Sequence, residues 1–308
     1  MIDLVVTYVY ERDKKWQQDF KYWKDKEISL GITDKKNRQA FGIERTREWD
    51  TFKYFFRSVE VNCSWINRII LIVQNKNHIP KWLNKDKVKI VYHEDYIPSE
   101  LLPTFNAMPI GFYVSNIQDL QEQYLMCDDD FIFLNPIAED RFFKDGKPVH
   151  EDNKIPYEPY IIFGASGLFM QILNNNLVFE ERYMKNKVKY GIYHLPEARL
   201  KDFEQEIIQN NKQEILDHFI KSKFRHQDNL CHYMFSDLLK ICNKAYIGEP
   251  YKNCSYVALN SKVKFNDYWD KDIVCFNDTE ILDDYELTKK KYIEFLQKKF
   301  PNKSSYEV

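Results

Sequence analysis

The chain has 308 residues, 44% of them hydrophobic and 16% aromatic, so it is long enough to bury a sizeable core as one large domain. Its 45 lysines and arginines stand against 47 acids, and a net charge of -2 argues against nucleic acid as a partner. No stretch reaches the roughly 20 apolar residues of a membrane span, and the first residues lack a basic leader, so we expect a cytoplasmic protein. The six cysteines form no Cys-x-x-Cys pair, which favours reduced core thiols over a zinc knuckle or a redox motif.

Strand-like and helix-like patterns alternate along the first part of the chain. The apolar runs 4–9, 69–73 and 88–91 are typical of buried strands. Between the first two runs, the apolar residues of 52–59 recur at helical spacing, with Asp50 placed to cap the helix. A strand, a helix and a second strand form a βαβ unit. Such units predict a mostly parallel sheet whose ligands bind beyond the carboxyl ends of the strands.

The second half of the chain has more helical patterns. The apolar spacing predicts helices over 203–208, 215–219 and 230–241, followed by a strand over 273–276. A last amphipathic helix is expected over 287–300, where it would pack against the sheet. The lysines on its polar side are either a solvated face or a surface for peripheral membrane association.

No repeat, low-complexity tract or flexible linker marks a domain boundary, so we expect a single domain over 1–308. The segment 145–159 is rich in Lys, Pro, Asp and Glu, and these residues predict an exposed loop. Such a loop is either plain surface or a lid over a site.

Three consecutive acids, Asp128, Asp129 and Asp130, lie between two apolar runs, 124–127 and 131–134. Their mutual repulsion disfavours ionisation of all three unless a cation neutralises them. Mg²⁺ and Mn²⁺ prefer oxygen ligands, and acid-x-acid spacing is typical of nucleotide-sugar enzymes that hold such an ion against a diphosphate. A solvated turn between two strands is the alternative for so short a motif.

Two later segments carry side chains suited to chemistry. His194 precedes a proline and a helix expected to begin near Glu197, and its ordinary pKa of ~6.5 suits a base that accepts a hydroxyl proton. Arg225 and Asp228 lie at the expected start of the 230–241 helix, where backbone N–H groups favour a phosphate. The alternatives are structural: a histidine bonded to the backbone, and a helix cap in which Asp228 closes the helix and Arg225 is solvated.

Taken in order, these segments resemble the Stealth family. These hexose-1-phosphate transferases include bacterial capsule polymerases and the N-acetylglucosamine-1-phosphotransferase of lysosomal targeting. The resemblance covers nearly the whole chain in four regions. The matching residues are 2–9 (IDLVVTYV), Asp13 and Trp16; then 47–49, 54–60, 65–69, 80–83, 102–106 (LPTFN) and 128–131 (DDDF); then 194–196 (HLP), Phe224, Arg225 and Asp228; and finally 275–278 (CFND).

The resemblance implies an α/β fold similar to the GT-A nucleotide-sugar type, a mixed sheet flanked by helices with a helical C-terminal part. Residues 1–144 would hold the nucleotide-sugar and the metal, and 160–308 would complete the active site. The implied reaction moves a hexose-1-phosphate or N-acetylhexosamine-1-phosphate from a UDP-sugar donor to a hydroxyl of a glycan or polysaccharide acceptor and releases UMP. This reaction would serve capsule synthesis at the inner face of the membrane. The alternatives are a metal-dependent glycosyltransferase that releases UDP and a non-enzymatic sugar-binding protein.

The same resemblance implies a metal site for Mg²⁺ or Mn²⁺. Asp129 and Asp130 would be its ligands, with Asp278 as a further one. Relatives tend to have Asn where Asp128 stands, which makes that residue the weaker ligand. The chain also has Tyr10-Glu11 where relatives have an Asn/Asp-Gly turn after the first strand.

For catalysis, the resemblance implies that His194 accepts the proton of the acceptor hydroxyl, that Arg225 holds the β-phosphate, and that Asp228 belongs to the same catalytic region. Arg47 and Arg57 would either reach a phosphate or form structural pairs. The residues expected to contact the donor are Asp3, Thr7, Tyr8, Arg47, Arg57 and Asn106.

Overall fold

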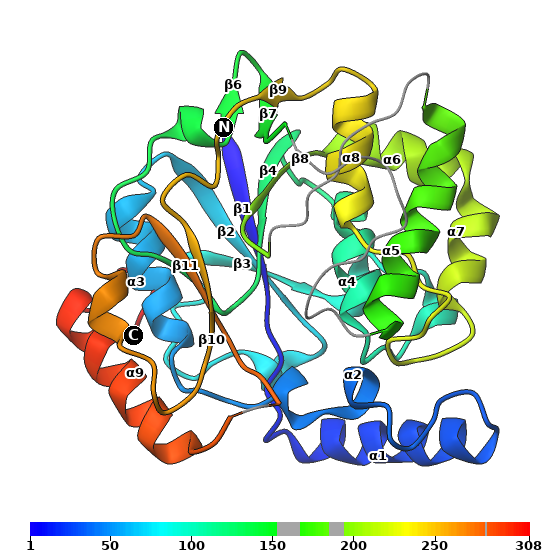
Figure 1. The fold of residues 1–308 in the computed structure, drawn as a ribbon, viewed down its shortest axis with the longest axis horizontal. Coiled ribbons are helices and arrows are strands. Elements are labelled where there is room, and N and C mark those ends of the chain that lie inside the picture. Colours follow the sequence, from blue (N-terminus) through cyan, green and yellow to red (C-terminus); the bar gives the residue numbers. More distant parts are fainter. Residues whose placement is uncertain (153–166, 185–193, 281) are drawn as a thin grey trace.

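A computed structural model describes residues 1–152, 167–184, 194–280 and 282–308 (Figure 1). Its centre is a five-stranded sheet in the order β3-β2-β1-β4-β8. These strands are β1 (Ile2–Thr7), β2 (Ile66–Val73), β3 (Val88–Tyr92), β4 (Gln123–Cys127) and β8 (Glu197–Leu200). The first four run parallel and β8 runs antiparallel to β4, so the mixed α/β sheet predicted from the sequence is confirmed.

Helices cover both faces of this sheet, which is why residues 4–6 of β1, 69–73 of β2 and 124–127 of β4 are continuous apolar runs. Successive residues of a strand point to opposite faces, so Leu4 and Val6 of β1 pack in one core and Val5 packs in the other. Helices α3 (Phe52–Asn62) and α9 (Tyr285–Lys299) lie on the first face (Figure 1). On the second face lie α4 (Ala107–Phe112), α5 (Gly167–Glu180), α6 (Lys201–Asn210), α7 (Lys212–Phe219) and α8 (Tyr233–Ile241).

The predicted terminal helix is confirmed as α9, whose Tyr292, Phe295 and Leu296 are buried in the first core. Across the described part of the chain, no helix combines the length and the apolar character needed to span a membrane. Two further helices, α1 (Lys14–Ser29) and α2 (Arg38–Phe41), lie beyond the carboxyl end of β1 (Figure 1).

Two small sheets complete the fold. One has the order β10-β11-β5 and comprises β10 (Ser255–Ala258), β11 (Ile273–Asn277) and β5 (Phe131–Phe133). The other comprises β6 (Phe143–Lys144), β7 (Lys147–His150) and β9 (Tyr246–Ile247). The prediction of a loop over 145–159 is therefore wrong at its start, where Asp145 and Gly146, with φ of 53° and 76°, form the two-residue turn of the β6–β7 hairpin. Residues 153–159 lie outside the described residues.

The segment after His194 does not open a helix, contrary to the expectation. Residues Glu197–Leu200 form β8, and α6 begins only at Lys201. The reason is tertiary: β8 pairs along β4, with Met126 opposite Glu197, and this pairing supplies the backbone hydrogen bonds that a helix would otherwise provide.

Two predicted helix caps are also wrong. The helix expected from 230 begins at Tyr233, so Asp228 lies well before it and does not cap it. Asp50 does not cap α3, because Thr51 occupies the cap position. Asp50 instead has φ of 57° and its carboxylate accepts a hydrogen bond from Lys289.

Candidate active site

The three acids follow β4 directly, at the carboxyl ends of the parallel strands β1 and β4. Val6 pairs with Cys127, so Thr7 and Asp128 leave the sheet side by side, and Thr7 Oγ1 donates to Asp128 Oδ1 at 3.4 Å. The crevice outside the carboxyl ends of strands is where open α/β sheets bind ligands.

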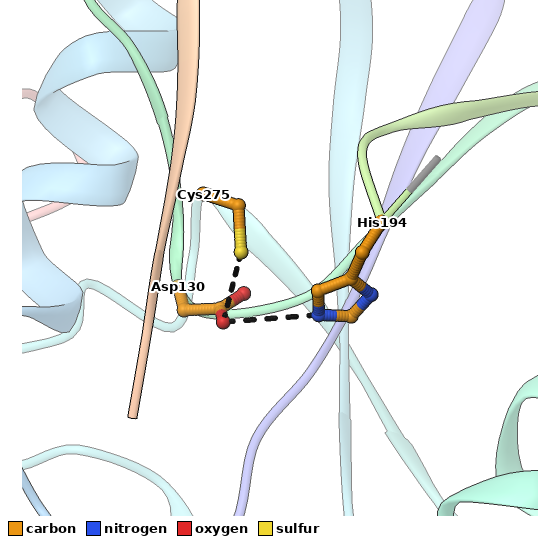
Figure 2. Close-up of side chains that lie close together, drawn as sticks. All are labelled: Asp130, His194 and Cys275. Atoms are coloured by element: carbon orange, nitrogen blue, oxygen red, sulfur yellow. Dashed lines mark hydrogen bonds and ion pairs between the residues drawn. The ribbon is translucent and has the colours of Figure 1, made fainter. Parts of the chain in front are cut away.

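Two other strands bring a histidine and a thiol to the acids (Figure 2). Because β8 runs antiparallel to β4, the residues before Glu197 pass alongside the acids, and His194 Nε2 lies 3.7 Å from Asp128 Oδ2 and 3.8 Å from Asp130 Oδ2. Strand β11 pairs with β5, and this places Cys275 Sγ 3.3 Å from Asp130 Oδ2. From the sequence, Cys275 was expected only to be a reduced core thiol, although it belongs to the fourth matching region.

The positive charge near Asp128, Asp129 and Asp130 does not balance the negative charge that these three carboxylates would carry. Loss of contact with water, followed by the charges of Asp130 and Asp128, raises the pKa of Asp129 well above its ordinary value. Burial also raises the pKa of Asp128, although His194 opposes this shift. Asp130 Oδ1 is buried and has no hydrogen-bond partner among the residues that the structure describes. Closely spaced, uncompensated carboxylate oxygens of this kind fit a divalent cation such as Mg²⁺.

His194 is held at both ring nitrogens. Burial alone would lower its pKa, but the hydrogen bond and charge of Asp130, with the charge of Asp128, raise the pKa above the ordinary value. On the other side of the ring, the Tyr233 hydroxyl lies 3.0 Å from Nδ1. The imidazole therefore has a fixed orientation, with Nε2 directed at the acids.

Two arginines meet at a single amide oxygen. Arg45 Nη2 and Arg225 Nη1 donate to Gln39 Oε1 at 3.3 and 3.0 Å. Neither guanidinium has a carboxylate within ion-pair distance in the described ranges. Burial and the charge of Arg45 lower the pKa of Arg225. Two neighbouring guanidinium groups without an acid partner favour an anion.

These groups line one cleft of about 890 Å³, a size typical of small-molecule sites. The predicted residues that line it are Thr7, Tyr8, Arg47, Asp128, Asp129, Asp130, His194, Arg225 and Asp278. Lining residues that the sequence analysis did not single out include Arg45, Glu48, His232, Tyr233 and Tyr256. Of these, Arg45 lies two residues from the predicted Arg47, whereas Tyr233 carries no signal in the sequence.

Three further predicted residues in the cleft, Arg47, Asp278 and Tyr8, also have protein partners. Arg47 Nε lies 3.2 Å from Asp278 Oδ2, and Trp49 Nε1 donates to the same oxygen at 3.1 Å. Burial raises the pKa of Asp278 to about 6 despite Arg47. The Tyr8 hydroxyl donates to Glu48. The role of Asp278 as a metal ligand and the donor contacts of Arg47 and Tyr8 stay predictions.

Four predicted residues do not line the cleft. Asp3 lies at the amino end of β1, opposite to Thr7, and Arg68 Nη2 donates to its carboxylate at 2.9 Å. The other three are Arg57, Asn106 and Asp228. Each has structural partners, described below, and the functional roles expected for these four residues stay predictions.

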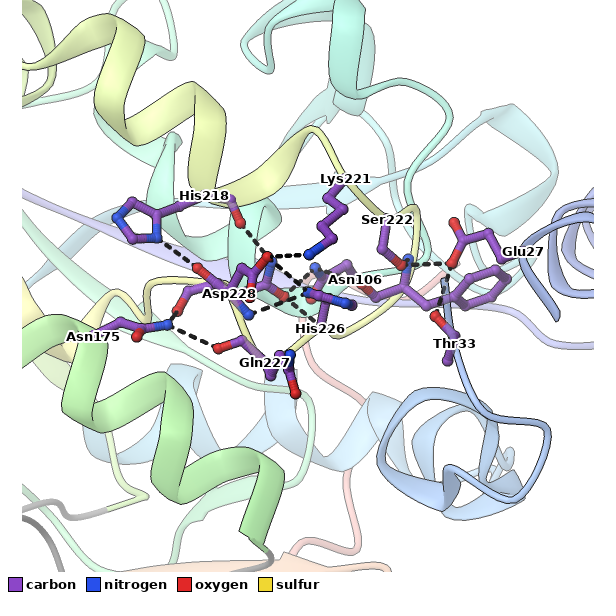
Figure 3. A network of polar contacts seen from close by, with 12 residues as sticks. Glu27, Thr33, Asn106, Asn175, His218, Lys221, Ser222, His226, Gln227 and Asp228 are labelled. Atoms are coloured by element: carbon purple, nitrogen blue, oxygen red, sulfur yellow. Dashed lines mark hydrogen bonds and ion pairs between the residues drawn. The ribbon is translucent and has the colours of Figure 1, made fainter. Parts of the chain in front are cut away.

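A polar network holds the loop that carries Arg225 (Figure 3). Asn106 Nδ2 donates to Phe224 O at 3.1 Å and to Asn229 Oδ1 at 2.8 Å, so it ties the two ends of this loop to the start of α4. Asp228 accepts a hydrogen bond from Lys221 Nζ at 2.7 Å. In this structure, Asn106 and Asp228 therefore hold the segments on either side of Arg225 and do not contact Arg225 itself.

Arg57 is part of a buried ion pair, and we expect Arg57→Ala to lower the free energy of unfolding by about 3–5 kcal/mol because it leaves Glu307 buried without a partner. Arg57 Nε and Nη2 donate to the two oxygens of Glu307 at 2.7 Å each, and Nη1 donates to Phe300 O at 2.9 Å. Denaturant unfolding measures the loss.

The matched control is Arg182→Ala, which removes a similar two-bond pair with Glu214 that is exposed. Its expected effect is about 0–1 kcal/mol. Equal losses in the two variants would contradict the structural role of Arg57. A weaker affinity of the folded Arg57→Ala protein for a UDP-sugar would instead support the predicted donor contact.

An unpredicted buried acid, Glu197, lies three residues after His194. Its carboxylate oxygens have no hydrogen-bond partner within the described residues, and Oε1 lies 3.6 Å from His232 Nε2. Burial raises the pKa of Glu197 to about 8 and lowers the pKa of His232 well below its ordinary value. Both groups are therefore uncharged near neutral pH.

We expect Glu197→Gln to be more stable than the wild type at pH 8. The pKa of Glu197 is about 8 in the folded state and 4.5 in the reference state, so the unfolded chain loses this proton first as the pH rises. The contribution of protonated Glu197 to the free energy of unfolding is therefore fully present below pH 4.5 and is lost as the pH rises through 8. The expected gain is on the order of a few kcal/mol. Urea unfolding at pH 5 and pH 8 measures it, and an equal pH dependence of the two proteins would contradict it.

Comparisons with known proteins identify a matching family model and relatives that align with the whole chain. A family model described as Stealth protein CR2, conserved region 2, matches residues 45–150. The capsular polysaccharide phosphotransferase WcwK of Streptococcus pneumoniae is 28% identical over 99% of this chain and 98% of its own. The receptor polysaccharide phosphotransferase WefC of Streptococcus oralis is 26% identical over 100% of this chain and 99% of its own.

The protein is therefore a transferase with a mixed α/β sheet. The predicted resemblance to the Stealth family is confirmed, since the chain carries this family's second conserved region and aligns from end to end with polysaccharide phosphotransferases. Among solved structures, the galactosyltransferase LgtC in complex with donor and acceptor sugar analogs is similar with a TM-score of 0.43 and 10% identity, over 96% of each chain.

Proposed function

We propose that this enzyme moves a hexose-1-phosphate or N-acetylhexosamine-1-phosphate from a UDP-sugar to a hydroxyl of a polysaccharide, releasing UMP. The observation that carries the proposal is one cleft lined by three acids, a histidine fixed at both nitrogens and two arginines without acid partners. The similarity to a capsular and a receptor polysaccharide phosphotransferase supports phosphotransfer in polysaccharide synthesis. The proposal takes residues 1–308 as one catalytic domain, placed at the inner face of a membrane by its acceptor.

The arginines suit the donor diphosphate. Arg45 and Arg225 would bind its oxygens where they now share Gln39, and guanidinium groups match phosphate geometry with paired hydrogen bonds. The acids Asp128, Asp129 and Asp130 would hold Mg²⁺ or Mn²⁺, which supplies charge neutralisation at the phosphates when bound. Charge spreads over the phosphoryl oxygens during transfer, so such positioning and neutralisation are the main requirements.

His194 is suited to act as the base. Its Nδ1 is occupied by the Tyr233 hydroxyl, and its Nε2 faces the acids that line the cleft. The acceptor oxygen would attack the β-phosphorus, the bond to the oxygen of UMP would break, and the acceptor proton would pass to Nε2. The nearby charges of Asp130 and Asp128 stabilise the resulting imidazolium.

The deciding experiment identifies the released nucleotide. Purified protein, Mg²⁺, a panel of UDP-sugars and a crude glycan acceptor are incubated together, and the products are resolved as UMP or UDP. Release of UMP that requires the acceptor would support the proposal and reveal the donor. Release of UDP would overturn it in favour of a glycosyltransferase that attacks the anomeric carbon.

A further inference from the structure

We propose that Asp130, His194 and Cys275 form a site for Zn²⁺, separate in its chemistry from the oxygen site for Mg²⁺, and that its occupation blocks transfer. The binding of zinc stands on the geometry of these side chains alone. Only the inhibition of transfer by bound zinc rests on the proposed function.

The three side chains converge from three separate segments (Figure 2). Cys275 Sγ lies 3.3 Å from Asp130 Oδ2, and His194 Nε2 lies 3.8 Å from the same oxygen. One ligand atom from each residue lies within 4.8 Å of the others. A tetrahedral zinc ion with bonds of about 2.0–2.3 Å separates its ligand atoms by about 3.3–3.6 Å. Small side-chain movements therefore suffice to form a three-ligand site.

The donor set favours zinc over magnesium. Zn²⁺ accepts sulfur, nitrogen and oxygen, whereas Mg²⁺ prefers oxygen and gains little from a thiolate or an imidazole. The contact between Tyr233 and Nδ1 of His194 is the kind of hydrogen bond that orients a metal-bound histidine. Three protein ligands would leave a fourth position for water, and two of these ligands, Asp130 and His194, line the cleft.

Occupation of this site and catalysis exclude each other. While His194 Nε2 donates its electron pair to zinc it cannot accept the acceptor proton, and Asp130 is withdrawn from the oxygen ligands of Mg²⁺. The Cys275 thiol releases its proton to solvent when its sulfur binds the metal. Zinc is therefore expected to inhibit in competition with Mg²⁺.

The test uses Co²⁺ as a spectroscopic substitute for Zn²⁺ on the full chain without substrate. The wild type is expected to bind one Co²⁺ with a thiolate-to-cobalt charge-transfer band that Zn²⁺ abolishes and equimolar Mg²⁺ does not. The band is expected to disappear in Cys275→Ser and to persist in the matched variant Cys63→Ser, which removes another buried free thiol. In Asp130→Asn, the affinity for Co²⁺ is expected to fall at least tenfold.

Absence of the band in the wild type, or its persistence in Cys275→Ser, would overturn the zinc site. Circular dichroism establishes whether Cys275→Ser is folded. If this variant is not folded, an unchanged affinity of Asp130→Asn for Co²⁺ would overturn the zinc site instead. This readout needs no turnover, so it is independent of whether UMP is released. If UMP release is observed, the ratio of rates with and without Zn²⁺ is compared in the wild type and Cys275→Ser. Equal ratios would overturn the proposed block.

Discussion

Replacement of His194 by alanine is expected to reduce turnover by about 10²–10⁴-fold while leaving the affinity for the UDP-sugar unchanged, because the change removes the proton acceptor for the attacking hydroxyl. The imidazole contacts the Tyr233 hydroxyl on one side and faces Asp128 and Asp130 on the other, so its Nε2 has a fixed direction within the cleft. Single-turnover release of UMP measures the chemical step, and calorimetric titration measures donor binding.

The control is His150→Gln, which alters a buried histidine of β7 that does not line the cleft. Its turnover per folded molecule is expected to match that of the wild type. The turnover of Tyr233→Phe is expected to lie between those of His194→Ala and His150→Gln. Its pH dependence is expected to shift, because the change removes the hydroxyl that contacts Nδ1 of His194. Near-normal turnover of His194→Ala would remove this residue from the mechanism.

Replacement of Asp130 by asparagine is expected to reduce metal-dependent turnover at least about a hundredfold, because a bound cation contributes several kcal/mol of charge stabilisation to such reactions. Asparagine keeps the size of the side chain and removes its charge. Of the three consecutive acids, Asp130 is the one with a buried oxygen that has no hydrogen-bond partner in the described part of the chain. The rate of UMP release is measured against the concentration of Mg²⁺.

The matched variant is Asp128→Asn, which makes the same change two residues earlier in the same acid cluster. A smaller loss is expected there, because Asp128 Oδ1 already accepts a hydrogen bond from Thr7. If both variants lose activity equally, Asp130 has no special part in holding the metal. An unchanged dependence of Asp130→Asn on Mg²⁺ would exclude it as a ligand.

The sequence predicts the first half of the fold well, for a simple physical reason. Strands covered on both faces are apolar throughout, so 69–73 is recognisable as a strand without knowledge of its partners. The helical spacing within 52–59 marks α3 in the same way. The acids after β4 then fall at the expected edge of the sheet.

Strand β8 shows where such prediction ends. Its segment contains two charged residues, Glu197 and Arg199, that are both buried. Arg199 is buried because Nε and Nη2 donate to Glu204 at 2.6 and 2.8 Å. No local pattern reports this partner, and the pairing with β4 decides the conformation. The sequence therefore suggested a helix at the one strand that brings His194 to the acids.

The site itself was only partly predictable for a related reason. Cys275 and Asp130 are 145 positions apart and meet because β11 pairs with β5. Arg45 and Arg225 meet through Gln39, which lies on α2. Single residues of suitable type are visible in a sequence, whereas their convergence depends on strand pairing and loop anchoring.

The short interval between His194 and β8 limits how this chain can change in evolution. Glu197 is fixed opposite Met126, and only two residues separate it from the catalytic candidate. One residue gained or lost in this interval would displace the imidazole by about 3.3 Å and turn it away from the acids while the sheet stayed intact. Insertions and deletions are therefore expected to be excluded between His194 and Glu197 in homologues that keep this site.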